Sequence, residues 1–232
     1  MADIYDRSAS IIRQIYDWRL TTPAVLDMKT YFPAGGDFAA AWGNIRDEAL
    51  AVARRLQEVP RFHEIMKEQV AISANDGLDW RLFILKAYGI ENRENMKACP
   101  ILASLVASAP DVISASFSFM AANKHIPAHR GPFRGVLRFY MPLVMPTDKE
   151  GMPAAVLKID GAEYRLAAGD CMLWDDTFVH EVWNRSDEVR TVLLLDVRRP
   201  NMPVDMLAFS WALMSVVRWG IRWRGLSGAV AR

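Results

Sequence analysis

Short runs of alternating apolar and polar residues, placed closely one after another, fill much of the second half of the chain. In ASFSF (115–119), apolar residues alternate with serines, which is the two-residue period of a strand with one buried face. Turn-forming sequences such as GAE, AAGD and NRSD separate the later runs. Many short strands at this spacing fold as a sandwich or barrel, so the sequence predicts a mainly β core. The predicted strands span 112–120, 134–144, 154–159, 163–166, 171–175, 179–184 and 189–197.

The segments before this core have mostly helical patterns. Helices are predicted at 3–19, 38–58 and, entered through Pro100, within 95–110, and a further strand is predicted at 79–89. The 38–58 segment is rich in alanine, with Asp37 as its expected N-cap and Pro60 after its end. We expect one domain, which is mostly helical over 1–78, a β core over 79–200 and a C-terminal helix within 201–232.

The C-terminal segment 204–225 combines an apolar helix pattern with tryptophans and arginines. Its uncharged apolar part, 206–217, is shorter than the roughly 18 residues that a membrane-spanning helix needs. Arg218, Arg222 and Arg224 lie among tryptophans, a mixture that suits a helix lying on a membrane surface. A helix packed on its own domain or on a partner subunit would show the same apolar period, and both interpretations stay open.

Charge and cysteine content narrow the class of protein. The 28 basic and 27 acidic residues leave a net charge of +1, which gives no support to nucleic-acid binding. The two cysteines, Cys99 and Cys171, have no metal-type spacing and form no disulfide framework. The N-terminal sequence MADIYDRSAS has no apolar signal region. We therefore expect a cytoplasmic protein, with the C-terminal helix allowing association with the inner surface of the membrane.

A histidine followed by an arginine occurs in two segments that are far apart. His129 precedes Arg138 by nine residues, and His180 precedes Arg190 by ten. Each arginine lies in an apolar run, where a guanidinium group is costly unless it meets an anion. Two imidazoles can bind a divalent metal, and two arginines can hold a dicarboxylate through charge-assisted hydrogen bonds. The pattern predicts a metal site with a diacid bound across it.

At these positions the chain resembles the aspartyl/asparaginyl β-hydroxylase family of oxygenases, which depend on Fe(II) and 2-oxoglutarate. The matching motifs are HRGP (129–132), LR (137–138), DDTFVHEVWN (175–184) and Arg190 ahead of the last strand, with further matches at Trp80, Tyr88-Gly89, Cys99-Pro100 and Phe117-Ser118. A second resemblance is to the bacterial branch that hydroxylates lipid acyl chains. It rests on TP (22–23), FP (32–33) and WGNIRDEA (42–49).

The resemblance implies a double-stranded β-helix, or jelly roll, in which His129 and His180 hold the iron. Most relatives in the wider superfamily add a carboxylate ligand two residues after the first histidine, where this chain has Gly131. Water and the 2-oxoglutarate chelate would then complete the iron coordination. The implied reaction uses O2 and 2-oxoglutarate, releases succinate and carbon dioxide, and hydroxylates an unactivated C–H bond.

The same resemblance assigns the residues that bind the cosubstrate. Arg190 and Ser118 would bind the distal carboxylate of 2-oxoglutarate, and Arg138 would lie near the carboxylate at the metal end. The family usually has a histidine two residues after that arginine, whereas this chain has Tyr140. Tyr140 faces the same side of the strand as Arg138, and its hydroxyl can still donate a hydrogen bond.

The other polar and aromatic residues near these motifs have simpler interpretations. Asp175 and Asp176 are expected to serve in turns and hydrogen bonds. The remaining residues are expected to be solvated histidines (His63, His125), solvated loop arginines (Arg130, Arg134) and packing tryptophans (Trp80, Trp174, Trp183).

The substrate is predicted only by class, as a small molecule, a lipid or a peptide. Ser116 and Val136 occupy positions where family members that act on aspartyl residues carry basic side chains, which argues against an acidic substrate. The upstream resemblance and the Trp/Arg-rich helix favour a lipid acyl chain. Two alternatives stay open: a non-catalytic module that binds metal and 2-oxoglutarate, and a metal sensor or isomerase of the same β architecture, which would not need Arg138 and Arg190.

Overall fold

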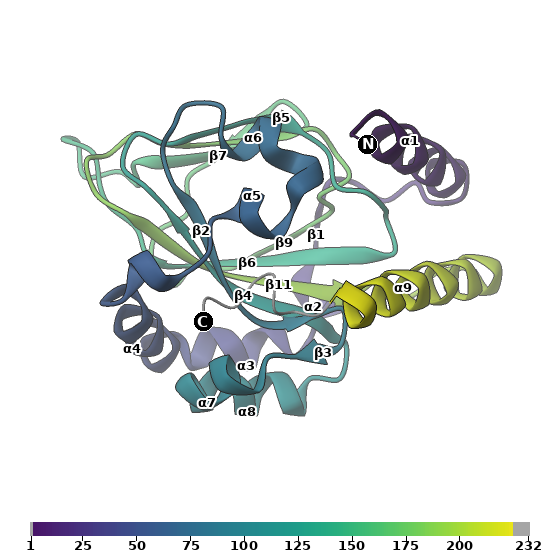
Figure 1. The fold of residues 1–232 in the computed structure, drawn as a ribbon, viewed down its shortest axis with the longest axis horizontal. Helices are drawn as coiled ribbons and strands as arrows, with labels where there is room; N and C mark the ends of the chain where they lie inside the picture. Colours follow the sequence, from purple (N-terminus) through teal and green to yellow (C-terminus); the bar gives the residue numbers. More distant parts are fainter. Residues whose placement is uncertain (1, 225–232) are drawn as a thin grey trace.

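Two antiparallel sheets face one another in the core of this computed structural model, which describes residues 2–224 (Figure 1). Over these residues, the larger sheet has the order β1-β9-β6-β11-β4-β2-β3 and the smaller sheet β5-β10-β7-β8. The larger sheet comprises Val25–Leu26 (β1), Met172–Trp174 (β9), Val136–Val144 (β6), Arg190–Arg198 (β11), Val112–Met120 (β4), Trp80–Ala87 (β2) and Ile90–Glu91 (β3). The smaller comprises His125–His129 (β5), His180–Asn184 (β10), Ala155–Ile159 (β7) and Ala162–Tyr164 (β8). This arrangement confirms the predicted jelly roll.

Alternation along the central strands separates a hydrophobic layer from a cavity. Phe117 and Phe119 on β4 point to a cluster of helix side chains beneath the larger sheet, because successive residues of a strand face opposite sides. Ser118, between them, faces the smaller sheet and lines the cavity between the sheets. The same division holds for β11, where Leu193 and Leu195 join the hydrophobic layer and Leu194 lines the cavity.

The predicted strands agree closely with the observed ones, but β5 and the two-residue strands β1 and β3 were not predicted. His125–His129 was not predicted as a strand, and Pro127 in its middle is the reason, since proline cannot donate a ladder hydrogen bond. β5 tolerates this proline because it lies at the edge of the smaller sheet. The omission matters because β5 carries one of the predicted metal ligands.

Helices cover the outer face of the larger sheet (Figure 1). They are Met28–Tyr31 (α2), Gly35–Ala40 (α3), Trp42–Ala53 (α4), Arg93–Ala98 (α7) and Pro100–Ser108 (α8). Shorter helical segments follow α4 and precede β2: Leu56–Glu58 (η1), Phe62–Ile65 (α5), Lys67–Gln69 (η2) and Val70–Ser73 (α6). Pro100 occupies the first turn of α8, as predicted.

The single helix predicted at 38–58 was wrong in its bounds and in its cap. The chain leaves helical geometry at Ala41, so α3 and α4 are separate helices, and the last part is η1. α3 begins two residues before Asp37, with Ala34 as its N-cap. A Cβ added at Gly35 would lie 2.7 Å from the Met28 sulfur, so a side chain there would require Met28 to shift.

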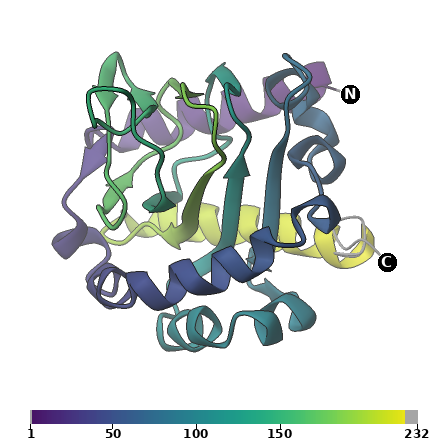
Figure 2. The ribbon, with the colours of Figure 1, turned by 90° about the vertical axis from the view of Figure 1, so that its left-hand side faces the viewer.

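Two longer helices, Ala2–Arg19 (α1) and Val204–Arg224 (α9), lie on the same side of the molecule (Figures 1 and 2). Figure 2 views the molecule from the side opposite α1 and α9, so both helices run behind the sheets. They meet where the Tyr16 hydroxyl and the Ser210 hydroxyl lie 2.5 Å apart. α9 confirms the C-terminal helix predicted from the sequence, whereas residues 225–232 lie outside the described residues. Both cysteines are free.

Candidate active site

The two predicted metal-binding histidines lie directly opposite one another on neighbouring strands. β5 and β10 pair antiparallel with His129 in register with His180, and the centroids of the two imidazole rings are 4.0 Å apart. The two histidines are 51 positions apart in the sequence, and they meet because β5 and β10 pair in one sheet. Both side chains line the cavity between the sheets.

Hydrogen bonds fix the same tautomer in both imidazoles. His129 donates from Nδ1 to the Pro127 carbonyl at 2.8 Å, and His180 donates from Nδ1 to the Phe178 carbonyl at 3.0 Å. A carbonyl can only accept, so Nε2 of each ring keeps its lone pair free. Burial lowers the pKa of His129 and lowers that of His180 well below its ordinary value. Both rings are therefore neutral at pH 7, the form that binds a metal.

On the side of the cavity formed by the larger sheet, a buried arginine lies among two hydroxyl groups. Arg190 donates from Nη1 to the Tyr140 hydroxyl at 3.0 Å. Ser118 accepts a hydrogen bond from Trp80 Nε1 at 3.0 Å, so its own hydroxyl proton is free to be donated. One guanidinium and two hydroxyl donors on neighbouring strands suit a carboxylate.

Arg138 differs from Arg190 because carboxylates already surround it. It donates from Nε and Nη2 to Asp196 at 3.0 and 2.9 Å, and Nη2 lies 3.2 Å from Asp176 Oδ2. These partners offset the cost of burying the guanidinium. Arg138 is therefore mostly paired within the chain, whereas Arg190 is more open to a bound anion.

Gly131 is required by the position of Asp176. A Cβ added at residue 131 would lie 2.2 Å from Asp176 Oδ1, and the Gly131 amide donates to the Asp176 carbonyl at 2.6 Å. A carboxylate side chain at position 131 is therefore excluded. Burial raises the pKa of the Asp176 carboxyl to about 6. The sequence predicted a turn role for this residue, but its carboxyl group pairs with Arg138 and fills the space beside Gly131.

Three buried polar atoms near the site lack a hydrogen-bond partner within the described residues. They are Arg190 Nε, Trp174 Nε1 and Asp176 Oδ1. Leaving such atoms unpaired costs about 1–3 kcal/mol each. A polar ligand in the cavity would relieve this cost for Arg190 and Trp174, which line the cavity. The cavity encloses about 380 Å³, open solvent at its mouth included. Donors on the larger sheet and imidazoles on the smaller sheet fit a diacid that spans the two.

All six residues that the sequence assigned to the site line this one cavity: Ser118, His129, Arg138, Tyr140, His180 and Arg190. Trp80 and Trp174, expected only to pack, line it too, together with Ile126, Leu157, Val182 and Leu194. Among residues 2–224, no three His, Cys, Asp or Glu side chains gather as a metal-binding group. The chain thus offers two imidazoles, and a metal bound there would take its other ligands from water and small molecules.

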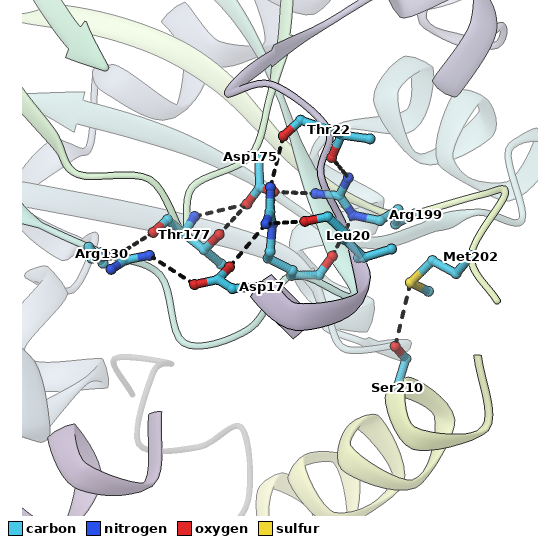
Figure 3. A network of polar contacts seen from close by, with 10 residues as sticks. Asp17, Leu20, Thr22, Arg130, Asp175, Thr177, Arg199, Met202 and Ser210 are labelled. Carbon is cyan, nitrogen blue, oxygen red and sulfur yellow. Dashed lines mark hydrogen bonds and ion pairs between the residues drawn. The ribbon is translucent and has the colours of Figure 1, made fainter. Parts of the chain in front are cut away.

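A buried network holds the loop that follows His129 (Figure 3). Asp175 binds Arg134 Nε at 2.8 Å and also pairs with Arg199, and it accepts hydrogen bonds from Thr177. Arg134 also donates to the Leu20 carbonyl at 2.8 Å. Arg134 was predicted to be solvated, which was wrong, because its charge is buried against Asp175. The turn role predicted for Asp175 is confirmed.

The other two histidines lie outside the cavity. His125 shares β5 with His129, but its Nε2 lies 2.7 Å from Glu181 Oε1 and its ring stacks on Trp183. His63 Nδ1 lies 3.1 Å from the Ser73 hydroxyl. Both are partly buried rather than fully solvated.

Comparison with known proteins decides the family. A model of the family described as aspartyl/asparaginyl beta-hydroxylase matches residues 39–200. The chain belongs to this family. The ornithine lipid ester-linked acyl 2-hydroxylase of Rhizobium tropici is 33% identical over 199 residues, which cover 85% of this chain and 68% of that protein. The human aspartyl/asparaginyl beta-hydroxylase is 27% identical over 166 residues, covering 69% of this chain and 20% of that protein.

Solved structures show weaker likeness. A prolyl-4-hydroxylase from Pseudomonas putida has a TM-score of 0.43 at 14% identity, over 69% of this chain and 88% of that one. A predicted oxalate decarboxylase from Thermotoga maritima has a TM-score of 0.34 at 12% identity, over 52% of this chain and 81% of that one. Family membership makes this chain an oxidoreductase of the hydroxylase class.

Proposed function

We propose that this hydroxylase uses Fe(II), 2-oxoglutarate and O2 to hydroxylate a C–H bond of a lipid acyl chain. The observation that carries the proposal is the pairing of His129 with His180, both with Nε2 free, in the cavity that also contains Arg190. Bound iron with 2-oxoglutarate supplies the oxidant for inserting one oxygen atom, with succinate and carbon dioxide as co-products.

The residues of the chain have separate tasks in this proposal. His129 and His180 hold the iron, and their Nδ1 hydrogen bonds to backbone carbonyls keep the rings oriented. Arg190 with its partner Tyr140, and the hydroxyl of Ser118, bind the distal carboxylate of 2-oxoglutarate. The unpaired Nε of Arg190 supports this role. Arg138, held by Asp196, presents a positive charge at the metal end.

Several observations support a lipid acyl substrate. Apolar side chains line part of the cavity, namely Ile126, Leu157, Val182 and Leu194. The relative that matches over 85% of this chain is named for acting on a lipid acyl group. The absence of basic residues at 116 and 136 is weaker evidence against an acidic substrate than the sequence suggested. Val136 belongs to a buried cluster with Met206 of α9 and is not among the residues that line the cavity.

Succinate formation tests the reaction. The purified chain, supplied with Fe(II), ascorbate and 2-oxoglutarate, should release succinate slowly without substrate and faster with one. His129→Ala and His180→Ala should each abolish this release. His125→Ala is the matched control, because it removes a histidine from the same strand outside the cavity. Iron-loaded protein that released no succinate under any condition would instead indicate a non-catalytic binding module.

Mass spectrometry tests the substrate class. A lipid with an ester-linked acyl chain, dispersed in detergent and incubated with the complete mixture, should gain one oxygen atom on that chain. An aspartyl-containing peptide serves as the competing substrate. Oxidation of the peptide with an unchanged lipid would overturn the lipid assignment while leaving the proposed cofactors in place.

A further inference from the structure

Large aromatic side chains on α1 and α9 are turned to solvent. Trp211, Trp219 and Trp223 on α9 are 70, 64 and 80% exposed, and Trp18 on α1 is 84% exposed. Tryptophan is usually well buried, and clustered exposed apolar side chains mark an interaction surface. Packing among residues 2–224 does not account for these four exposed side chains.

On α1 the exposed apolar residues form one stripe. Ile11, Ile15 and Trp18 follow one another at four and three residues, the spacing of a single helix face. Tyr16, on the other side of the helix, is fully buried against α9. α1 therefore has an exposed apolar stripe on the side away from Tyr16, and no described residue buries it.

α9 is fixed to the protein along its opposite face. Met206 and Met214 are buried, Ser210 lies 2.5 Å from the Tyr16 hydroxyl, and Arg218 donates to the Tyr88 carbonyl at 3.0 Å. By length and composition alone, the helix could cross a membrane. These contacts run over three turns, however, and a crossing helix would have to break them. A bilayer can meet α9 only along its exposed face, with the helix lying flat.

The charge on this part of the chain favours an anionic surface. From residue 206 to 224 the sequence contains three arginines and no aspartate or glutamate. Arg222 is exposed beside Trp223, and the acidic residue nearest to this segment in the sequence, Asp205, is paired with Arg19 at 2.9 Å. Exposed tryptophans together with arginines are the composition of helices that rest at the headgroup level of anionic membranes.

Both helices contact the segment that leads from His129 to β6. Arg13 of α1 donates to the Gly131 carbonyl at 3.1 Å. Gly135 packs so closely on α9 that an added Cβ would lie 2.6 Å from the Ser210 hydroxyl. Among the residues lining the cavity, His129 is one of the few that are only partly buried. The two helices thus contact the loop that directly follows this partly buried histidine.

We propose that the exposed faces of α1 and α9 dock the protein on an anionic bilayer. This docking face consists of Ile11, Ile15, Trp18, Trp211, Trp219 and Trp223. Docking would bring the mouth of the cavity to the headgroup level, so that an acyl chain reaches it without leaving the membrane. The inference rests on the lipid substrate proposed above and adds the surface that delivers it.

Vesicle flotation tests the docking face without using catalysis. The full chain is mixed with vesicles of about three parts phosphatidylcholine to one part phosphatidylglycerol, and with vesicles of phosphatidylcholine alone. The wild-type chain should float with the anionic vesicles, and less with the neutral ones. Trp211→Glu with Trp219→Glu should reduce the floated fraction about tenfold or more, because each charge opposes insertion of the face. Trp18→Glu should reduce it less.

The matched control places the same two charges elsewhere. Ile101 and Met152 are also exposed apolar residues, at 42 and 53%, away from α1 and α9. Ile101→Glu with Met152→Glu should float like the wild type. Circular dichroism spectra should be the same for all variants, since every substituted side chain is exposed.

Three outcomes would overturn the proposal. The wild type could fail to float, the Trp211/Trp219 variant could float equally well, or the control variant could lose binding to the same extent. A wild type that forms a dimer, with dimerisation lost in the Trp211/Trp219 variant and no flotation, would make the face an interface between two copies. The reaction is judged separately by succinate release, so a chain that floats but makes no succinate leaves docking intact.

Discussion

The Arg190 guanidinium donates a hydrogen bond from Nη1 to the Tyr140 hydroxyl at 3.0 Å. The hydroxyl accepts this bond and keeps its own proton for another acceptor. The Tyr140 hydroxyl therefore provides a further hydrogen-bond donor beside Arg190 in the cavity. Tyr140 is also the residue at which this sequence departs from the family pattern. This geometry argues that the tyrosine replaces the usual histidine as a donor.

Tyr140→Phe should weaken the binding of 2-oxoglutarate. Losing a hydrogen bond to a charged group costs about 1.5–3 kcal/mol, so the KM for 2-oxoglutarate should rise about tenfold or more. kcat should fall much less, since the hydroxyl is proposed to bind the distal carboxylate and not the metal end of 2-oxoglutarate. Initial rates of succinate release over a range of 2-oxoglutarate concentrations measure both. Tyr140→His keeps a donor and should lie closer to wild type; an unchanged KM in Tyr140→Phe would remove the tyrosine from the cosubstrate site.

Gly131→Ala should destabilise the fold through a collision with Asp176, since the added Cβ would lie 2.2 Å from Oδ1. Overpacking of this kind costs about 1–3 kcal/mol. Urea unfolding of the metal-free protein measures the change. In an Asp176→Ala background the same substitution should cost clearly less, because the colliding atoms are absent. Equal costs in both backgrounds would show that Asp176 is not what excludes a side chain at 131.

Much of the β core was predictable because its alternation is local. Residues 112–120 show the two-residue period of a strand, and they form β4 with the same bounds. The motifs that carry the six predicted site residues are short and distinctive, so these residues could be singled out from the sequence. Their convergence in one cavity depends on the pairing of β5 with β10, which no local pattern specified.

Other features depended on tertiary contacts that the sequence does not display. Arg134 lies in an apparently open loop, yet it is buried because Asp175, 41 residues away, supplies its counter-charge. Asp175 and Asp176 are adjacent in the sequence, so no local pattern distinguished their roles. Their environments differ because Asp175 pairs with Arg134 and Arg199, whereas Asp176 lies beside Gly131 and pairs with Arg138. Residue 41 is an alanine and neither proline nor glycine, so the sequence at this residue did not predict the break between α3 and α4.

Asp175→Asn should destabilise the fold strongly, because it leaves the buried charges of Arg134 and Arg199 without their shared carboxylate. Removing one partner of a buried ion pair costs about 3–5 kcal/mol. Urea unfolding followed by tryptophan fluorescence measures the loss. Asp205→Asn breaks an exposed pair with Arg19 and should change stability little. A similarly small effect for Asp175→Asn would mean that the network in Figure 3 adds little to stability.

Metal binding should stabilise the protein through His129 and His180, and 2-oxoglutarate should add to this through Arg190. Mn(II) serves as a redox-silent substitute for iron. At about 100 times its Kd, it should stabilise the fold by about 2.7 kcal/mol, which raises Tm by about 5–10 °C in a chain of this size. Differential scanning fluorimetry of the chelator-treated protein measures the shift. His180→Ala should lose it, whereas His125→Ala should keep it.

Arg190→Met should keep the shift with Mn(II) alone and lose only the further increase on adding 2-oxoglutarate, which separates the metal ligands from the residues that hold the diacid. A full 2-oxoglutarate increment in Arg190→Met would place the distal carboxylate elsewhere in the cavity.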